Sequence, residues 1–341
     1  MSQVSLLDCT LRDGAYLLPD KTFGEEAIRG ISQGLADAGI DFIEIGFLQN
    51  DGAGEGRTVY GDCREASGFL PKDRKNARFA VLADYSRYTA ENLDDRTEGG
   101  IDAVRECFFR QERDGALEAC RRIKERGYLL FIQPVDILGY TEEELGRLLD
   151  RINALEPYCF SIVDTFGSMY PEDLQRIFAL IDGQLAPSIR LGFHSHNNIQ
   201  LSNALSQELI RMGAGKRDVI IDCSVSGMGR GAGNTPTELI ARYLNDRHGH
   251  GYDLDRLLDL IDRYIDGLHD HWAWGYSTEF FLAGCAGAHV NNIAYLRAKP
   301  GIRYQEIRSI LDRLGSQERK RYDYGLLEKA YREILREKTD E

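Results

Sequence analysis

The chain has 341 residues, of which 43% are hydrophobic and 28% charged, so it is long enough for one large domain with a modest appendage. Its 55 acidic residues outnumber its 42 basic residues, which gives a net charge of -13. This surplus argues against nucleic acid or an anionic membrane surface as the partner, because both require an extended basic surface. An anionic small molecule is not excluded, because it needs positive charge only locally.

Cysteine usage and the N-terminal residues both indicate the cytoplasm. The seven cysteines stand singly, without a C-x-x-C pair, and several lie in apolar runs, which is typical of reduced thiols. The chain meets a charged residue within its first eight positions and shows no signal-peptide core. No apolar run approaches the roughly 18 residues that a membrane helix needs. We therefore expect a cytoplasmic protein.

Short apolar runs alternate with longer amphipathic stretches over most of the chain. Eight such strand–helix units in about 245 residues have the size and rhythm of a (β/α)8 TIM barrel. A doubly wound open sheet is the structural alternative. The predicted strands are Val4–Asp8, Phe42–Phe47, Arg78–Ala83, Ala103–Phe109, Leu129–Val135, Cys159–Val163, Arg190–His194 and Val219–Cys223.

The remainder of the chain is predicted to be helical, and no strand pattern follows Gly249. We therefore divide the chain into a catalytic barrel over residues 1–248 and a helical C-terminal domain over residues 249–341. The charged tail after Gly315 is expected to be exposed. The helices predicted around the barrel are Glu25–Ala38, Gly115–Arg126, Glu142–Leu155, Pro171–Leu180 and Leu201–Arg211, and those of the C-terminal domain are Leu254–Leu268, Glu279–Tyr295 and Tyr304–Leu314.

The sharpest local pattern is His194-Ser195-His196, at the end of the seventh predicted strand. Residues two apart on a strand point to the same face, so both imidazoles can aim at one point. Two imidazoles need a carboxylate to complete a site for a divalent ion. Asp13, just after the first strand, is well placed in a closed barrel, because the first and seventh strands both border the eighth. The alternative interpretation is a polar rim that binds no metal.

Arg12 belongs to the same turn as Asp13. A guanidinium there can neutralise the oxyanion that forms when an enolate develops. The alternative is an ordinary salt bridge to Glu44, which would emerge from the second strand nearby. The two interpretations are compatible, with Glu44 holding the arginine in place.

A glycine-rich run, Gly227–Asn234, follows the eighth predicted strand. Glycines such as Gly231 and Gly233 let the backbone approach a ligand closely, and N–H groups at a helix start favour anions. Asn234 either caps the next helix or offers its amide oxygen to the metal. A flexible connector is the alternative for the whole run. Asp164, at the end of the sixth strand, is expected at the same rim, where it would contact substrate or support the site.

At these residues the sequence resembles the DRE-TIM metallolyases, the HMG-CoA lyase-like family. The likeness rests on L-R-D-G after the first strand, H-S-H-N-N at the seventh and G-A-G-N-T-P after the eighth, and it spans roughly residues 4–245. It implies Mn²⁺ or Mg²⁺ as the cofactor, with Asn234 on or near the metal and Arg12 as the enolate stabiliser. The metal ligands that it implies are Asp13, His194 and His196.

Within the family, G-A-G-N-T-P-x-E looks most like the aldolase branch, that of 4-hydroxy-2-oxovalerate aldolase. The lyase branch carries a catalytic cysteine in this glycine-rich loop, and here there is none. The synthase branch has a long C-terminal regulatory domain, for which residues 249–341 are too few. The resemblance therefore favours an aldolase.

One position departs from the aldolase pattern. Where that branch has its catalytic histidine, three residues after the metal-binding aspartate, this chain has Tyr16, and a free phenol titrates near a pH of about 10. Three hypotheses are open: Tyr16 acts with a lowered pKa, a C-terminal histidine replaces the missing base, or the substrate differs from 4-hydroxy-2-oxovalerate. His271 and His289 are the candidate histidines, and a surface or packing role is the alternative for each. Tyr276 loosely matches a tyrosine that the aldolases bring from their C-terminal domain to the active site.

The resemblance implies a divalent-metal-dependent aldolase that cleaves or forms a carbon–carbon bond between a pyruvate-type enolate and an aldehyde, with a 4-hydroxy-2-oxo acid as substrate. The alternative is a Claisen-type acyltransferase, similar to isopropylmalate synthase, that condenses acyl-CoA with a 2-oxo acid. The sequence shows no basic cluster at the barrel mouth for the nucleotide of CoA. A third hypothesis is an interaction scaffold, because aldolases of this type often pair with an acylating aldehyde dehydrogenase. A homo-oligomer is also expected.

Overall fold

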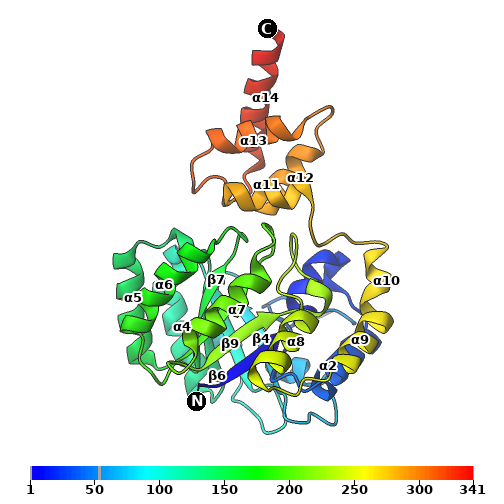
Figure 1. The fold of residues 1–341 in the computed structure, drawn as a ribbon, viewed down its shortest axis with the longest axis vertical. Coiled ribbons are helices and arrows are strands. Elements are labelled where there is room, and N and C mark those ends of the chain that lie inside the picture. Colours follow the sequence, from blue (N-terminus) through cyan, green and yellow to red (C-terminus); the bar gives the residue numbers. More distant parts are fainter. Residues whose placement is uncertain (1, 53–54, 341) are drawn as a thin grey trace.

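The computed structural model describes residues 2–52 and 55–340 and shows a closed barrel of eight parallel strands with helices around it (Figure 1). Strand β1 pairs with both β2 and β9, which closes the barrel. The predicted (β/α)8 barrel is therefore confirmed, and the open-sheet alternative is wrong. The strands are β1 (Val4–Asp8), β2 (Phe42–Leu48), β3 (Val59–Tyr60), β4 (Arg78–Asp84), β5 (Ala103–Phe108), β6 (Leu129–Pro134), β7 (Cys159–Asp164), β8 (Arg190–Ser195) and β9 (Val219–Cys223). The short β3, which the sequence pattern missed, pairs with β2 outside the barrel.

The surrounding helices begin and end at ordinary capping signals. In α5, for example, the Thr141 side chain accepts the Glu144 N–H while the Glu144 carboxylate accepts the Thr141 N–H, and Leu145, Leu148 and Ile152 form the buried face. Helix α5 coincides with its prediction. The helices of the barrel are α1 (Thr10–Asp13), α2 (Glu25–Asp37), α3 (Cys63–Ser67), α4 (Arg113–Glu125), α5 (Glu142–Leu155), α6 (Pro171–Gln184), α7 (Ser202–Gly213) and α8 (Thr237–His248).

The inward-facing side chains of the barrel change from apolar to polar toward the carboxyl ends of the strands. The lower layer is an apolar cluster that includes Leu7, Phe42, Phe131 and Ile220. Since side chains two residues apart on a strand share a face, the residues two positions farther on form the next layer. That layer is mostly polar and is buried: Cys9, Glu44, Leu82, Arg105, Gln133, Ser161, His194 and Asp222. The barrel therefore places charged groups under its mouth on an apolar base.

The C-terminal third of the chain contributes to two different cores. Helices α9 (Leu254–Leu260) and α10 (Asp266–His269), joined by a π-helical turn at Ile261–Ile265, lie in the barrel part of the molecule, and α9 packs against α2 and α8. Helices α11 (Thr278–Ala286), α12 (Val290–Arg297), α13 (Tyr304–Arg313) and α14 (Tyr324–Asp340) form a second cluster above the barrel (Figure 1).

Two C-terminal predictions are wrong in detail. The single helix predicted at Glu279–Tyr295 is two helices, because Gly287 adopts a left-handed φ of 54° that ends α11, and the His289 side chain then caps α12. The tail predicted to be exposed forms α14, whose Leu327 and Ile334 are buried in the second core. Its apolar residues recur at helical spacing, but they need a partner surface that the sequence does not reveal.

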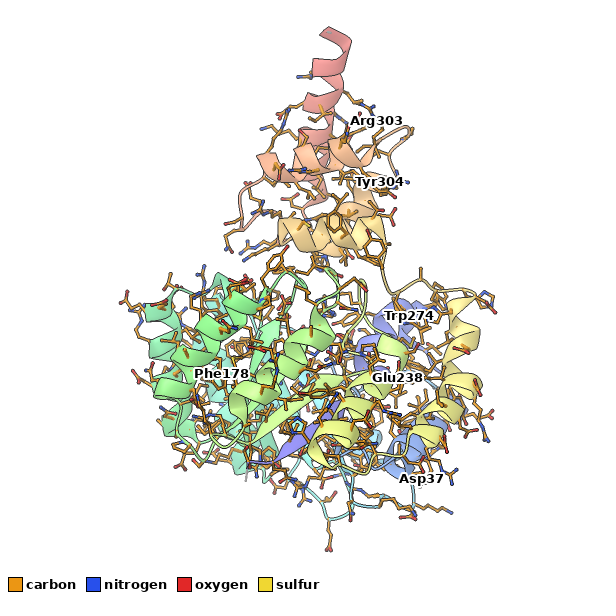
Figure 2. The ribbon with its side chains drawn as sticks, viewed as in Figure 1. Asp37, Phe178, Glu238, Trp274, Arg303 and Tyr304 are labelled. Carbon is orange, nitrogen blue, oxygen red and sulfur yellow. The ribbon has the colours of Figure 1, made fainter. Side chains whose placement is uncertain are left out.

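The chain passes from the barrel to the upper helices just after Trp274 (Figure 2). The Trp274 indole donates to the Ser226 carbonyl at 2.9 Å and stacks on His269, which fixes this edge of the barrel. Trp274 packs in the main core and Leu282 in the second core. The chain therefore passes from one core to the other between these two residues. The predicted boundary at residues 248 and 249 stays a prediction, and residues 1 and 341 at the ends of the two predicted domains lie outside the described part.

None of the helices in residues 2–52 and 55–340 combines the length and apolarity that crossing a membrane requires. All seven cysteines are free thiols, and five of them are buried.

Two helical glycines offer a test of packing between α2 and α9. A Cβ on Gly34 would lie 2.6 Å from Cδ2 of the buried Leu260, whereas a Cβ on Gly183 of α6 would meet nothing within 4 Å. We expect Gly34→Ala to lower the free energy of unfolding by about 1–3 kcal/mol through overpacking. Gly183→Ala should raise it by about 0.4–1 kcal/mol, because alanine restricts the unfolded chain. Urea unfolding measures both, and stabilisation by both substitutions would contradict the described packing.

Candidate metal centre and active site

Three predicted ligands meet at the mouth of the barrel. The short helix α1 directly after β1 carries Asp13, and the end of β8 carries His194 and His196. Ligand atoms of the three side chains lie within 4.8 Å of one another, and all three residues are buried. The two imidazole rings stand nearly perpendicular, with centroids 5.1 Å apart. The structure therefore brings together the three residues that the sequence singled out, although 181 positions separate Asp13 from His194.

Each histidine has one ring nitrogen directed at a carboxylate. The Nδ1 atom of His194 lies 3.0 Å from Oδ2 of Asp222 on β9, which leaves Nε2 for a ligand. Such a carboxylate orients a metal-binding histidine and fixes its tautomer. The Nδ1 atom of His196 lies 3.9 Å from Oδ2 of Asp13, too far for a hydrogen bond. This separation suits two atoms that each lie about 2.1 Å from one ion.

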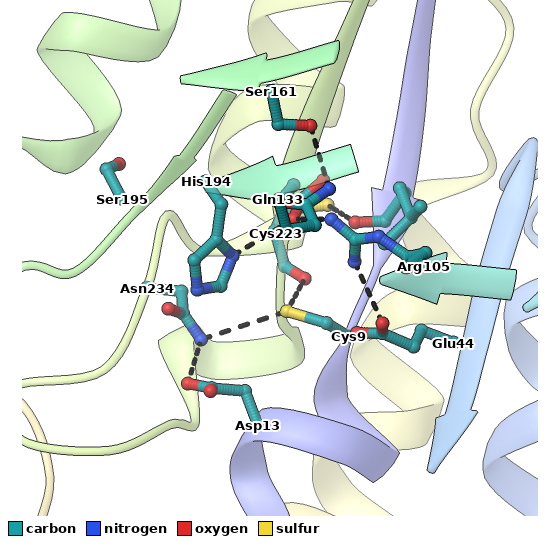
Figure 3. A network of polar contacts seen from close by, with 12 residues as sticks. Cys9, Asp13, Glu44, Arg105, Gln133, Ser161, His194, Ser195, Cys223 and Asn234 are labelled. Atoms are coloured by element: carbon teal, nitrogen blue, oxygen red, sulfur yellow. Dashed lines mark hydrogen bonds and ion pairs between the residues drawn. The ribbon is translucent and has the colours of Figure 1, made fainter. Parts of the chain in front are cut away.

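A chain of buried ion pairs links the two sides of the centre, and Figure 3 shows its link between Glu44 and Arg105. Arg12 donates from Nη1 to Asp13 Oδ1 at 2.5 Å and from Nε to Glu44 Oε2 at 2.7 Å. Arg105 continues the chain, with its Nη1 3.0 Å from the other Glu44 oxygen and its Nη2 paired with Asp222. Glu44 therefore has the predicted salt bridge to Arg12. Arg105 and Asp222 were missed, although each stands two residues after an inward-facing apolar residue of the same strand.

Charge and burial set the protonation of the ligands. Burial acts to raise the pKa of Asp13, but the positive charge of Arg12, with smaller contributions from His196 and His194, holds it well below its usual range. Burial lowers the pKa of His196 to about 3 against the attraction of Asp13. At neutral pH the site therefore offers an ionised carboxylate and a neutral imidazole with a free lone pair, which are the forms that bind metal ions.

The glycine-rich loop brings Asn234 and backbone groups to the same point. Asn234 donates from Nδ2 to Asp13 Oδ2 at 2.9 Å, and its backbone bridges to His196. A Cβ on Gly229 would lie 2.6 Å from Asp13 Oδ2, so only glycine fits there. Gly233 has a φ of 82° and its Cβ would meet the Gly227 carbonyl oxygen at 1.8 Å, while Gly231 has a φ of 68° and lies against Asn198. These glycines are required for the loop to pack closely around Asp13. A flexible connector would not need glycine at these positions.

Two buried acceptor atoms at the centre have no hydrogen-bond partner among the described residues: Nδ1 of His196 and Oδ1 of Asn234. Buried polar atoms are normally paired, and an unpaired one is costly. A cation held with Asp13 and His194 would satisfy both. The donor set of one carboxylate, two imidazoles and an amide oxygen suits a divalent ion such as Mn²⁺, Mg²⁺ or Zn²⁺. The residues present therefore fit a divalent metal.

A cavity of about 470 Å³ opens above the centre and is roofed by the C-terminal helices. Its barrel walls include the next inward layer of the strands, Asp84, Cys107, Val135, Val163 and His196. Its C-terminal wall consists of His289, Lys320, Arg321 and Tyr322.

The predicted catalytic residues divide between the cavity and the surface. Arg12, Tyr16 and His289 line the cavity. His271 and Tyr276 do not line it, and both are exposed, Tyr276 by 66% of its surface. The structure therefore does not bring them into the cavity, and their catalytic roles stay predictions. Both lie at the edge where the chain leaves the barrel, before the segments that form the roof.

Asp164 is the last residue of β7, is buried and does not line the cavity. Its carboxylate accepts the backbone N–H groups of Ser168 and Met169, at 3.0 and 3.2 Å, and so shapes the loop between β7 and α6. Burial raises the pKa of Asp164 to about 7. Its contact with substrate, which the sequence suggested, is not supported by this geometry.

The candidate bases each hold a proton. Tyr16 is 38% exposed overall, and the partial burial of its phenol raises its pKa, with the charge of Arg230 opposing this effect. The hypothesis that Tyr16 acts with a lowered pKa therefore gains no support and stays a prediction. Burial, followed by the charge of Arg230, lowers the pKa of His289 to about 3, and its Nδ1 accepts the Asn291 N–H at 3.1 Å. The single proton of this neutral ring is therefore on Nε2, which makes His289 a hydrogen-bond donor in this conformation.

Sequence reasoning also missed a group of cations. Five basic residues line the cavity: Arg12, Arg87, Arg230, Lys320 and Arg321. No basic cluster is visible in the sequence at the barrel mouth because these residues come from four separate segments. The only signal was the position of Arg230 inside the glycine-rich run.

Comparison with known proteins agrees with this geometry. A family model described as HMGL-like matches residues 100–263. A 4-hydroxy-2-oxovalerate aldolase of Pseudoalteromonas translucida is 30% identical over 79% of this chain and 77% of its own length. The chain belongs to the HMGL-like family. Relatives named as aldolases make it a carbon–carbon lyase, and the candidate metal site agrees with the divalent-metal dependence of the family.

Other members of this family differ in activity. An oxaloacetate decarboxylase of Mycobacterium tuberculosis is 30% identical over 74% of this chain and 74% of its own length. The solved structure of the HMG-CoA lyase of Brucella melitensis superposes with a TM-score of 0.62 at 19% identity, over 79% of this chain and 100% of that one, which is a likeness of fold. The HMGL-like fold alone therefore does not select the substrate.

Replacing Arg105 tests the buried ion pairs without touching a ligand. In Arg105→Met the carboxylates of Glu44 and Asp222 lose their shared partner, and we expect the free energy of unfolding to fall by about 3–5 kcal/mol. Arg121→Met is the control, because Arg121 pairs with glutamates at 54% exposure on the surface of α4, where ion pairs contribute about 0–1 kcal/mol. Denaturant unfolding distinguishes the two. Equal stability of both variants would mean that Arg105 does not balance the two carboxylates.

Proposed function

We propose that the protein is a divalent-metal-dependent aldolase that cleaves a 4-hydroxy-2-oxo acid into a pyruvate-type enolate and an aldehyde, or forms the same bond in reverse. The observation that carries this proposal is the meeting of Asp13, His194 and His196 at the floor of a cavity that also exposes Arg12. The relatives named as 4-hydroxy-2-oxovalerate aldolases, and their sequence identity to this chain, support the same reaction. A scaffold would not need three convergent ligands, and the acyltransferase alternative gains no support from these relatives.

Asp13, His194 and His196 would hold Mn²⁺ or Mg²⁺, with Oδ1 of Asn234 as a further ligand. The bound ion would supply Lewis-acid chemistry at the keto oxygen of the 2-oxo acid. Asp222 would keep His194 in the tautomer that presents Nε2, because it accepts the proton of Nδ1.

Arg12 is proposed to stabilise the enolate. Its Nε and Nη1 are already held by Glu44 and Asp13, so the guanidinium is fixed in orientation, and no described residue accepts a hydrogen bond from its Nη2. A hydrogen bond from a fixed, buried cation to the oxygen on which charge develops strengthens as the carbon–carbon bond breaks. The enolate then takes a proton on carbon to give the 2-oxo acid product.

Ligand variants test the metal and the reaction together. Asp13→Asn and His194→Ala should lose bound Mn²⁺ and lower turnover of 4-hydroxy-2-oxopentanoate by at least about 100-fold, because each removes a ligand of the charged centre. His248→Gln is the matched control, since His248 lies exposed at the end of α8, outside the cavity. Elemental analysis and pyruvate release are the measurements. Unchanged metal content and turnover in the ligand variants would refute the proposal.

A second reaction is favoured because neither candidate base of the cavity is free to accept a proton. Retro-aldol cleavage needs a base for the hydroxyl proton of the substrate, but Tyr16 and His289 both hold protons. Decarboxylation of a 2-oxo acid with a carboxylate on carbon 3 needs no base: carbon dioxide leaves, the bonding electrons form the same enolate, and a donor protonates carbon 3. Tyr16 lines the cavity and keeps its phenolic proton at neutral pH, so it is the candidate donor. The oxaloacetate decarboxylase relative supports this second candidate.

Substitution of Tyr16 separates the two reactions. If Tyr16 is the proton donor, Tyr16→Phe should slow pyruvate formation from oxaloacetate by about 10²–10⁴-fold, the usual contribution of an acid catalyst. Tyr16→His should raise retro-aldol turnover of 4-hydroxy-2-oxopentanoate, because an imidazole titrates nearer neutral pH. Both are measured by coupled pyruvate assays on the Mn²⁺-loaded protein. If Tyr16→Phe leaves both rates unchanged, Tyr16 transfers no proton in either reaction.

The seven free thiols are in keeping with the cytoplasmic location that we propose. The homo-oligomer and the aldehyde dehydrogenase partner stay predictions.

A further inference from the structure

The cavity is larger and more positive than a pyruvate unit and a simple aldehyde require. Its volume of about 470 Å³ lies within the roughly 300–1,000 Å³ of pockets that hold drug-sized ligands. Five cationic side chains line it, against the two carboxylates of Asp13 and Asp84. In a chain with 55 acidic and 42 basic residues, this local excess of positive charge needs an explanation.

Three of the five cations are balanced by carboxylates of the protein. Arg12 is held by Glu44 and Asp13. The Nε atom of Arg87 lies 3.5 Å from Asp84. Lys320 binds both oxygens of Asp136, at 2.7 and 2.9 Å.

Among the side chains that the structure describes, those of residues 2–52 and 55–336, no carboxylate lies within ion-pair distance of Arg230 or Arg321. Arg230 lies in the glycine-rich loop, where its backbone N–H donates to Asp13 at 3.2 Å and its guanidinium covers the Tyr16 ring at 5.3 Å. These contacts hold the side chain beside the metal centre, over the cavity.

Arg321 faces the same cavity from the C-terminal roof. Its segment, between α13 and α14, is anchored because the buried Asn292 side chain donates to the carbonyls of Arg319 and Arg321, at 2.7 and 2.9 Å. The barrel loop and the roof thus each contribute to the cavity lining one arginine without a carboxylate partner among the described side chains. A guanidinium offers a planar fork that matches a carboxylate or phosphate.

We propose that the substrate carries a second anionic group, at the end remote from its 2-oxo acid, and that Arg230 and Arg321 bind this group. The inference rests on the proposed function and narrows it: the aldehyde half of the substrate is itself an acid, either a carboxylate or a phosphate ester. Occupation of this subsite joins the roof to the barrel, because one arginine comes from each.

Binding of two matched five-carbon acids tests the subsite without turnover. 2-Oxoglutarate and 2-oxopentanoate differ only in the distal carboxylate, and calorimetric titration of the Mn²⁺-loaded protein should show about tenfold or tighter binding of 2-oxoglutarate. In Arg230→Gln and in Arg321→Gln this preference should fall toward one. Arg308→Gln is the matched control, because Arg308 is exposed on α13 and lies outside the cavity. Equal affinities, no binding of 2-oxoglutarate, or a preference that survives both substitutions would overturn the subsite.

Turnover then distinguishes the two anions. With pyruvate as the common partner, succinic semialdehyde is compared with butanal, and glyceraldehyde 3-phosphate with glyceraldehyde. A higher kcat/KM for one charged member of these pairs, lost in the arginine variants, identifies a carboxylate or a phosphate as the natural group. Turnover of the neutral aldehydes without any gain from charge would leave the aldolase standing and reject the subsite. Tight, arginine-dependent binding of 2-oxoglutarate without aldol turnover would support the subsite and reject the aldolase.

Discussion

The ion-pair chain Asp13–Arg12–Glu44–Arg105–Asp222–His194 is the interaction on which the rest of the site depends. Its members come from five separate strands or their following turns, so the chain forms only in the closed barrel. Charges this deeply buried are costly unless each is paired on every side, and here carboxylates and guanidiniums alternate. The same pairing fixes the metal-facing nitrogen of His194 and the orientation of Arg12. Stability and chemical competence of the centre therefore have one physical origin.

The barrel and the C-terminal helices contribute different things to the cavity. The barrel supplies the ligands and the fixed cation beside them, all of which are held by neighbours within 3.9 Å. The roof supplies His289, Lys320 and Arg321 from segments between or at the ends of helices. Loops can change their side chains without altering the barrel, so substrate range is set where the two parts meet. His271 and Tyr276 are exposed because they precede in sequence the segments that form the roof.

The features that depend on short-range rules were the ones best predicted from the sequence. All eight barrel strands begin where their apolar runs predicted, and the two-residue period correctly aimed His194 and His196 at one point. Asp222 and Arg105 obey the same period, yet a single buried charge on a strand does not disclose its partner across the barrel. The shared role of Arg230 and Arg321 could not be predicted, because their segments lie about 90 positions apart and meet only at the cavity. The helix α14 was missed as a core element for the same reason.

Apart from the carboxylates of Asp13 and Asp84, the protons and charges that line the cavity favour the accumulation of negative charge on a bound molecule. Tyr16 and His289 present hydrogen-bond donors, Arg12 and Arg230 present cations, and Asp13 is already committed to Arg12, Asn234 and the proposed metal. An environment of this kind gives little help in withdrawing a proton from the substrate and much in holding electrons that arrive on its oxygen. The site thus promotes bond cleavage mainly by stabilising the enolate that forms. The departing fragment, aldehyde or carbon dioxide, is determined by what the substrate carries next to that enolate, and the same electrostatic framework serves either.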